Sequence, residues 1–425
     1  MPAKKTKRKA DFRVVEICAG AGGQALGLEK AGFDHELAVE LDRHACETLR
    51  SNRDWDVAEG DVASSAVWKP TDYEGVDLLA GGVPCPPFST AGKQLGASDE
   101  RDLFAWAVET AGLMKPRALM LENVRGLSAP RFAAYRQRIL DRLTEFGYVA
   151  EWRLLQASNF GVAQLRPRFV LVALRPEDSE YFHWPKTTAT RKTVGSELKS
   201  LMGEAGWKHV DDWVRLANDI APTLVGGSKK HGGADLGPTR AKRAWLELGV
   251  SGMGIANEPP AENAPHPSEV PPKLTIPMVA KLQGWKGGEW RFAGLKTAQY
   301  RQIGNAFPPP VATAIGKSII AAFEQTGAKR EIAENTPETI HDAIYRELSA
   351  ADGFVSAAKL LDLAPELTGA PALERRIANL SRDFVVDIQQ TKIGVSYRLG
   401  EFKGFTGQED HQRHEYIASF KSRVS

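Results

Sequence analysis

The sequence predicts an α/β fold, in which a doubly wound, mostly parallel sheet is interrupted by an insertion and followed by a small terminal domain. Short apolar runs alternate with amphipathic stretches from Arg13 to Arg175, a glycine-rich turn follows the first run, and the alternation stops near Pro176. Strands that alternate with helices are typical of a parallel sheet covered on both faces. The 425 residues are enough for two or three domains.

The apolar runs mark the expected strands, and the stretches between them mark the helices. R-V-V-E-I-C-A predicts the first strand, and G-Q-A-L-G-L-E-K-A-G predicts a helix that ends at Gly32. E-L-A-V-E-L and H-A-C-E-T-L-R predict the next strand and helix. Further strands are expected in V-D-L-L-A, A-L-M-L-E-N-V and F-V-L-V-A-L, and helices over 103–114 and 131–146. Ligands of such sheets bind at the carboxyl ends of the strands.

The middle of the chain has a different composition. Residues 177–295 are rich in Gly, Pro, Lys, Thr and Trp and show little periodicity. A helical pattern then returns in T-A-Q-Y-R-Q-I-G-N-A and continues beyond a proline cluster. We therefore expect the first domain to span residues 12–176 and 296–328, with 177–295 as an insertion.

The region after Glu331 predicts a separate domain over residues 333–403, followed by a tail over 404–425. Three helical stretches, T-I-H-D-A-I-Y-R-E-L, V-S-A-A-K-L-L-D-L and A-L-E-R-R-I-A-N-L-S-R-D-F, precede the hairpin pattern F-V-V-D-I-Q-Q-T-K-I-G-V-S-Y-R-L. Three helices followed by two strands is the order of a winged helix. A packing or dimerisation module is the equal alternative.

Charge and cysteine content limit the function classes. The formal net charge of +2 does not indicate a nucleic-acid partner, although residues 1–11 include five cations and predict a disordered basic arm. Three cysteines without a C-x-x-C motif argue against a disulfide framework and against a metal site. No apolar run approaches the roughly 18 residues that span a bilayer, and no signal peptide is evident, so a cytosolic location is expected.

The glycine-rich turn C-A-G-A-G-G-Q-A predicts a cofactor site. Gly20, Gly22 and Gly23 allow a tight turn and close approach of a ligand. Glu40 ends the second strand about 20 residues later, where a carboxylate accepts ribose hydroxyls. Asp61 follows a possible third strand and is suited to an adenine amino group. The turn also fits the G-x-G-x-x-A dinucleotide pattern, so a nicotinamide or flavin enzyme, or a structural turn, stays open here.

One thiol lies in an unusually restricted backbone. Cys85 stands between prolines in G-G-V-P-C-P-P-F-S, directly after the strand V-D-L-L-A. Prolines lower the entropy cost of holding one loop shape. A free cysteine is usually a small buried apolar residue, but a nucleophile is the residue that needs a fixed direction of attack. The pattern therefore predicts a nucleophile at the carboxyl edge of the sheet.

Two further stretches are expected at the same edge. L-E-N-V places Glu122 at the end of an apolar strand, and Q-L-R-P-R-F-V places Gln164, Arg166 and Arg168 before another strand. Taken singly, these would be a capping carboxylate and surface charges. Together with Cys85 they indicate a catalytic site.

This set of motifs resembles the cytosine-C5 DNA methyltransferase family, of the kind found in type II restriction–modification systems. The resemblance rests on C-A-G-A-G-G, P-C-P-P-F-S, E-N-V, Q-L-R-P-R and Q-I-G-N-A, which follow the family's order over roughly residues 13–176 and 297–325. Cys18 and Leu41 depart from the aromatic residues common at those positions. The resemblance implies a Rossmann-like fold that binds S-adenosylmethionine, with the insertion as target-recognition domain.

The resemblance also implies roles for individual residues. Cys85 would attack carbon 6 of a flipped cytosine, Glu122 would share a proton with N3, and Arg168 would hold O2 with Arg166 beside it. The expected cofactor contacts are Cys18, Ala19, Gly20, Gly22, Gly23, Glu40, Leu41, Asp61, Val62, Pro84, Leu103, Asn305 and Ala306. The expected DNA contacts are Ser89, Lys93, Gln164, Lys229, Lys230 and Arg240.

The sequence therefore predicts a monomeric DNA (cytosine-5-)-methyltransferase that acts on a short double-stranded DNA site and is paired functionally with a restriction endonuclease. An RNA cytosine methyltransferase is the nearest alternative, but the large basic insertion favours duplex DNA. A DNA-binding regulator with an inactive core is a third possibility, against which the intact Cys85, Glu122 and Arg168 argue. A nicotinamide oxidoreductase is disfavoured because nothing supplies its catalytic groups.

Overall fold

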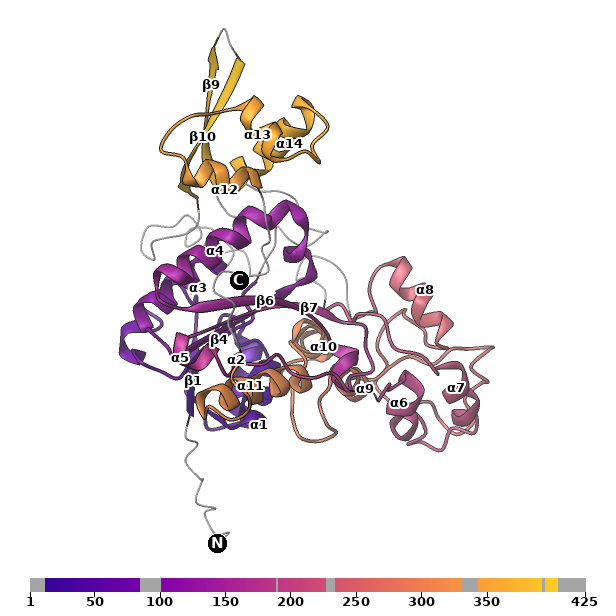
Figure 1. Ribbon diagram of the computed structural model, residues 1–425. Coiled ribbons are helices and arrows are strands. Elements are labelled where there is room, and N and C mark those ends of the chain that lie inside the picture. Colours follow the sequence, from indigo (N-terminus) through magenta and orange to yellow (C-terminus); the bar gives the residue numbers. More distant parts are fainter. Residues whose placement is uncertain are drawn as a thin grey trace.

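The computed structural model describes residues 12–84, 101–188, 190–226, 234–330, 343–391 and 394–403. A seven-stranded sheet with the order β3-β2-β1-β4-β5-β7-β6 forms the centre of the molecule (Figure 1). The first five strands in that order are parallel, whereas β7 is antiparallel to both β5 and β6. The strands are β1 (Phe12–Ile17), β2 (Phe33–Glu40), β3 (Val57–Glu59), β4 (Leu78–Gly81), β5 (Ala118–Val124), β6 (Val149–Gln156) and β7 (Pro167–Leu174).

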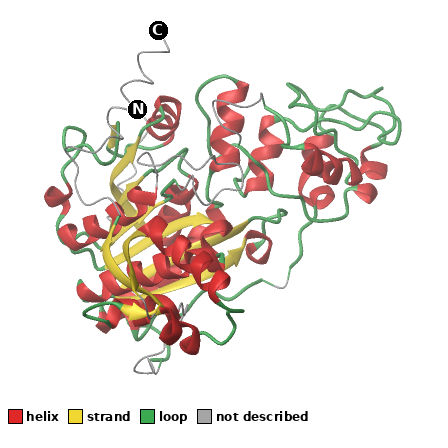
Figure 2. Ribbon diagram, turned by 90° about the horizontal axis from the view of Figure 1, so that it is seen from above, coloured by secondary structure: helices red, strands yellow, loops and turns green. Residues whose placement is uncertain are grey.

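Helices cover both faces of this sheet, so the predicted α/β fold is confirmed (Figure 2). Alternate residues of β1 serve the two faces: Val14 packs into the same apolar cluster as Ile315, and Val15 packs with Phe104. The helices of this body are α1 (Gly23–Ala31), α2 (Arg43–Asn52), α3 (Arg101–Met114), α4 (Ala133–Glu145), α5 (Pro176–Ser179), α10 (Lys296–Asn305) and α11 (Pro309–Phe323). Short 3-10 turns are η1 (Pro70–Tyr73), η3 (Arg125–Ser128), η4 (Pro130–Phe132) and η5 (Ala157–Phe160).

The chain returns to this body after the insertion through α10 and α11. Helix α11 packs on α1 so closely that a Cβ atom on Gly27 would lie 2.4 Å from the Cβ of Ala312. Residues 296–323 are long and apolar enough to cross a membrane by those two criteria alone, but 61% of the apolar window is buried in the protein. The two helices are therefore core helices, separated at Ala306.

The insertion lies beside the sheet (Figure 1), and its apolar residues form one cluster with residues of the body such as Leu26 and Leu49. Trp213 and Trp245 are fully buried in it. Its helices are α6 (Val194–Met202), α7 (Val210–Leu216), α8 (Thr239–Glu247) and α9 (Ile276–Gln283). The weak periodicity of the sequence did not predict these short helices.

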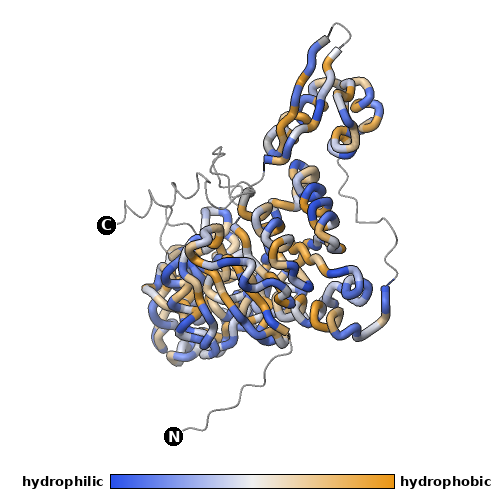
Figure 3. Tube along the Cα trace, turned by 90° about the vertical axis from the view of Figure 1, so that its left-hand side faces the viewer, coloured by the Kyte–Doolittle hydropathy of each residue, from blue (hydrophilic) through white to orange (hydrophobic). Residues whose placement is uncertain are grey.

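The terminal region contains α12 (Ala343–Ala350), β8 (Val355–Ser356), α13 (Ala357–Leu363), α14 (Ala370–Asp383), β9 (Phe384–Thr391) and β10 (Gly394–Phe402). Its antiparallel sheet has the order β8-β10-β9, and the short strand β8 precedes α13 in a stretch expected to be wholly helical. Figure 3 shows this unit projecting from the body. It contacts α4, where the Tyr345 hydroxyl lies 3.1 Å from Asp141 and the Phe402 ring lies 5.8 Å from that of Tyr135.

Candidate active site

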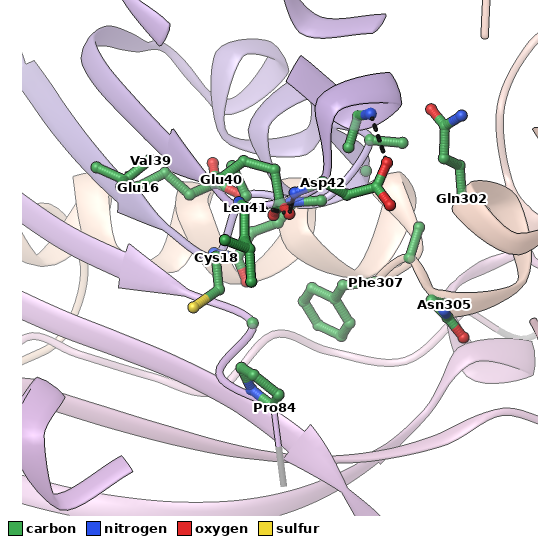
Figure 4. A pocket seen from close by; sticks show the side chains of 18 of the residues that line it. Glu16, Cys18, Val39, Glu40, Leu41, Asp42, Pro84, Gln302, Asn305 and Phe307 are labelled. Atoms are coloured by element: carbon green, nitrogen blue, oxygen red, sulfur yellow. Dashed lines mark hydrogen bonds between the residues drawn. The ribbon is translucent and has the colours of Figure 1, made fainter. Parts of the chain in front are cut away.

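A cavity of about 310 Å³ lies at the carboxyl ends of β1, β2 and β4 (Figure 4). This is the edge at which a doubly wound sheet binds ligands. Ten of the residues expected to contact a cofactor line it: Cys18, Ala19, Gly20, Gly23, Glu40, Leu41, Val62, Pro84, Asn305 and Ala306. Gly22, Asp61 and Leu103 do not line this cavity. Leu103, which belongs to α3, packs into the apolar core of the body.

The glycine turn is built from left-handed backbone. Cys18, Gly20 and Gly22 have φ angles of 51°, 55° and 83°. A side chain at Gly22 would clash, because a Cβ atom there would lie 2.6 Å from the Trp290 ring. The Gly20 amide donates to Glu40 Oε2 at 2.7 Å, which ties the turn to the end of β2. The turn therefore presents backbone, and no bulky side chain, to a ligand.

The Glu40 carboxylate is held in one orientation at this edge. Its Oε1 accepts from the amides of Leu41 and Asp42 at 2.8 and 2.7 Å, and Oε2 accepts from Gly20. Burial raises the pKa of Glu40 above its usual value, although the three backbone bonds act in the opposite direction. Asp42 caps α2 by accepting from the amides of His44 and Ala45.

Several residues around the cavity were missed by the sequence analysis. Gln24 is 3% exposed, and neither atom of its side-chain amide has a hydrogen-bond partner within the described part of the chain. Glu16 bonds His35 at 2.9 Å through Oε2, while its Oε1 is buried and unpaired. Glu16 could have been found from the sequence, because it is a carboxylate inside an otherwise apolar strand next to a glycine turn. The other lining residues that were not predicted are Ala21, Val39, Asp42, Ala45, Gly60, Gly82, Arg301, Gln302 and Phe307.

Glu122 and Arg168 meet beside the cavity. Their strands, β5 and β7, pair so that Val124 is opposite Arg168, which puts Glu122 diagonally across from the guanidinium on the same face. Arg168 Nε lies 2.5 Å from Glu122 Oε1, and Glu122 lines the cavity. Burial raises the pKa of Glu122, with Arg168 and Arg166 acting against this rise. The carboxyl group is therefore suited to hold a proton.

The strand end that carries Glu122 also fixes the start of the proline-rich loop. The side-chain amide of Asn123 donates to the carbonyl of Val83 at 3.2 Å, and its oxygen accepts from the Val124 amide. Pro84, the last described residue before the predicted nucleophile, lines the cavity. The predicted residues Cys85, Ser89, Lys93, Lys229 and Lys230 lie outside the described residues.

Arg166 and Gln164 are buried, and their side chains form hydrogen bonds to other segments of the chain. Arg166 is 1% exposed and donates to the carbonyls of Leu224 and Gly304 at 2.7 and 2.6 Å. Gln164 is fully buried, donates to Gln283 Oε1 at 2.6 Å and accepts from the Leu224 amide. Both residues connect β7 to the insertion and to α9 and α10. The catalytic role expected of Arg166 and the DNA contact expected of Gln164 stay predictions.

Of the DNA contacts expected in the insertion, Arg240 is described, and it is exposed on α8. In Figure 1, α8 lies on the part of the insertion that projects away from the central sheet. The Arg240 side chain is therefore available to a ligand in solution, whereas the side chains of Gln164 and Arg166 are buried.

Comparisons with known proteins agree with this geometry. Residues 12–321 match the family described as C-5 cytosine-specific DNA methylase. The type II methyltransferase M.NaeI of Lentzea aerocolonigenes is 60% identical over 415 residues, covering 97% of this chain and 99% of the relative. The type II methyltransferase M.NgoMIV of Neisseria gonorrhoeae is 48% identical over 319 residues, covering 74% of this chain and 99% of the relative.

Solved structures support the fold. A mutant of Spodoptera frugiperda DNMT2 has a TM-score of 0.52 at 16% identity and covers 73% of this chain and 99% of its own. The Entamoeba histolytica methyltransferase EhMeth has a TM-score of 0.51 at 12% identity, covering 73% and 98%. At such identities the likeness concerns the fold, whereas the sequence matches identify the family. The chain belongs to the C-5 cytosine-specific DNA methylase family.

Proposed function

We propose that this DNA cytosine-5-methyltransferase takes its methyl group from S-adenosylmethionine and transfers it to a cytosine flipped out of a short duplex DNA site. The observation that carries the proposal is the position of Glu122: it lines the cavity beside the glycine turn, contacts Arg168, and stands next to the loop that leads to Cys85. An acid and a guanidinium at this strand edge, with a cysteine that directly follows the described Pro84 in the sequence, are the groups that cytosine activation needs.

The residues around the cavity fit S-adenosylmethionine. The fixed Glu40 carboxylate is suited to ribose hydroxyls, and the unpaired polar atoms of Gln24 and Glu16 are suited to the amino-acid end. Leu41 and Phe307 supply apolar surface for the adenine ring. When bound, this cofactor supplies an electrophilic methyl group. Asn305 and Ala306 would close the far side of the site.

The chain's own groups would activate the base. The Cys85 thiolate adds to carbon 6 of cytosine and loads electron density onto carbon 5. Glu122, whose pKa burial raises, shares its proton with N3 and offsets the charge that develops on the ring. Arg168 holds O2 and fixes the Glu122 carboxyl group by direct contact. After methylation, loss of hydrogen 5 and elimination of Cys85 restore the ring and the enzyme.

The base must leave the stack before carbon 6 can be attacked, at a cost of a few kcal/mol. The loop that contains Ser89 and Lys93 would close over the extruded base. Lys229, Lys230 and the exposed Arg240 would bind the duplex from the insertion. Two relatives are named type II methyltransferases, which supports a role in protecting host DNA from a cognate restriction endonuclease. The cytoplasmic location and the monomeric state stay predictions from the sequence.

Duplex DNA with 5-fluorocytosine at the target position tests this proposal. Fluorine cannot leave as a proton does, so a covalent protein–DNA adduct should accumulate when S-adenosylmethionine is present and survive denaturing electrophoresis. Cys85→Ser should give no adduct while still binding DNA. An adduct formed only with RNA would favour the RNA methyltransferase alternative. An adduct that persists in Cys85→Ser would remove that thiol from the mechanism.

A further inference from the structure

A second cluster of chemically active side chains lies in the insertion, away from the cavity. His209 is the residue before α7, Asp212 is in the first turn of that helix, and His266 belongs to a later segment that returns beside it. The two segments are joined by a backbone bridge between Gly206 and Ala261. The fold therefore brings together, in this histidine–aspartate cluster, residues that are far apart in the sequence.

A second contact supports the same arrangement of segments. The indole nitrogen of Trp207 donates to the carbonyl of Ala264 at 3.1 Å. Trp207 is 2% exposed, so this bond is fixed by the core of the insertion. Trp207 is two residues before His209, and Ala264 is two residues before His266. Their hydrogen bond therefore holds the backbone near each histidine in place independently of the histidine side chains.

The distances inside the cluster are too long for direct hydrogen bonds. Asp212 Oδ2 lies 3.7 Å from His209 Nδ1 and 3.6 Å from His266 Nε2. An N–H···O bond spans about 2.7–3.2 Å. A tetrahedral zinc ion with bonds of about 2.0–2.1 Å keeps its ligand atoms roughly 3.3–3.4 Å apart. These two separations are therefore closer to the edges of a metal coordination tetrahedron than to a hydrogen bond, and all three ligand atoms lie within 4.8 Å of one another.

The neighbours of the cluster orient its ligand atoms. The Ser268 amide donates to His266 Nδ1 at 3.3 Å, and the Ser268 hydroxyl lies 2.7 Å from the same nitrogen, so Ser268 fixes the orientation of this ring. Metal binding through Nε2 requires the ring proton on Nδ1, where the hydroxyl oxygen can accept it in place of the amide bond. Arg215 pairs with Oδ1 of Asp212, which leaves Oδ2 facing the two histidines.

We propose that His209, Asp212 and His266 bind a zinc ion, with water completing the coordination sphere. Two imidazoles and a carboxylate are a ligand set that zinc accepts. The three side chains are 37–38% exposed, so the ion and its water can enter from solvent. The ion fastens the returning segment to α7 and stabilises the insertion, with no part in the methyl-transfer chemistry. No metal was expected from the sequence, because it contains no C-x-x-C motif or local Cys/His cluster.

Cobalt(II) titration of the metal-free full-length chain tests this site. Cobalt at a tetrahedral site of two histidines and one aspartate should give visible d–d bands, saturate at one equivalent, and lack the ultraviolet charge-transfer band of a cysteine ligand. Zinc should displace it. His209→Gln, Asp212→Asn and His266→Gln should each lose the bands. His183→Gln, an exposed histidine elsewhere, is the matched control and should keep them.

Thermal unfolding gives a second measurement. Zinc should raise the melting temperature of the wild type and of His183→Gln relative to chelator-treated protein, and should leave the three cluster variants unchanged. Because the cluster residues are partly exposed, the three variants should have the same melting temperature as the chelator-treated wild type. Equal melting temperatures would establish that the variants fold. Cobalt bands of equal strength in wild type and cluster variants, or a wild type that binds neither ion, would overturn the proposal.

Discussion

Arg168 Nε lies 2.5 Å from Glu122 Oε1, and the two side chains are only 10% and 11% exposed. An attractive charge this close ordinarily lowers the pKa of a carboxyl group, but burial outweighs it here, and the pKa of Glu122 is raised. The pair therefore combines two properties that a proton donor needs: a close contact that restricts its orientation, and a proton that is retained to higher pH than in an exposed carboxyl group.

The first prediction concerns pH. A raised pKa keeps Glu122 protonated to higher pH, so kcat should fall on the alkaline side as the group loses its proton. Glu122→Gln should lower kcat by about 100-fold or more and abolish that alkaline limb, while cofactor and DNA affinities stay close to wild type. Methyl incorporation measured from pH 5 to 9 checks this. A Glu122→Gln profile with the same alkaline limb would assign the titration to another group.

The second prediction contrasts two glycines in the same turn. Gly22→Ala places a Cβ atom 2.6 Å from the Trp290 ring and 2.8 Å from Leu49, so it should destabilise the fold by about 1–3 kcal/mol. Gly20→Ala meets no described atom within 4 Å, so its methyl group enters open space at the cavity. The left-handed backbone at this position should lower the free energy of unfolding of Gly20→Ala by about 1–2 kcal/mol. The methyl group should also weaken cofactor binding about tenfold, or by about 1.4 kcal/mol.

Urea unfolding and calorimetric titration with S-adenosylhomocysteine separate the two effects. Unchanged affinity in a folded Gly20→Ala variant would show that the cofactor does not approach this side of the turn.

Local pattern was enough to predict most of the body of the fold. Strand β5 was predicted with its observed bounds, and Gly32 was expected, correctly, to end α1. Strand β6 was not predicted, because V-A-E-W-R-L-L-Q at a sheet edge carries charged residues and no clear alternation. The antiparallel entry of β7, which brings Arg168 to Glu122, depends on strand pairing, and no single stretch of sequence encodes that pairing.

Burial was the property that the sequence predicted least well in the site. Gln164 and Arg166 are polar residues in a motif associated with function, and polar residues are usually exposed. Here the terminal nitrogens of Arg166 and the amide nitrogen of Gln164 donate to backbone carbonyls and to Gln283, which come from segments more than 50 residues away. The zinc ligands proposed above pose the same problem, since His266 reaches His209 only through the tertiary fold.

The third prediction compares a buried and an exposed arginine, Arg166 and Arg240. Arg166→Met leaves the carbonyls of Leu224 and Gly304 buried without a donor, so the free energy of unfolding should drop by about 2–4 kcal/mol. Arg240→Ala should change stability by less than about 0.5 kcal/mol. It should instead weaken DNA binding and reduce the slope of log affinity against log salt by about 1. A stable Arg166→Met variant that still binds DNA but loses kcat would support the catalytic role expected of Arg166.

The fourth prediction concerns the terminal unit, residues 343–403. The relative M.NgoMIV aligns over 99% of its length with 74% of this chain, and the family match ends at residue 321. The unit touches the body through α4, at Tyr345 with Asp141 and at Phe402 with Tyr135. A chain that ends after Arg330 should therefore methylate DNA with a kcat within roughly threefold of the full chain, a change below 1 kcal/mol.

The cut must follow Arg330, because this residue donates to the Ser179 carbonyl and pairs with Glu151 on β6. A chain that ends at Ala328 is the matched control, and it should be less stable than the longer truncation in urea. Loss of the terminal unit also exposes Tyr135, which is 1% exposed in the full chain, so both truncations should unfold at lower denaturant concentration. If the longer truncation folds and binds S-adenosylhomocysteine but no longer methylates DNA, the terminal unit takes part in DNA engagement, and its winged-helix order of elements becomes the explanation to test.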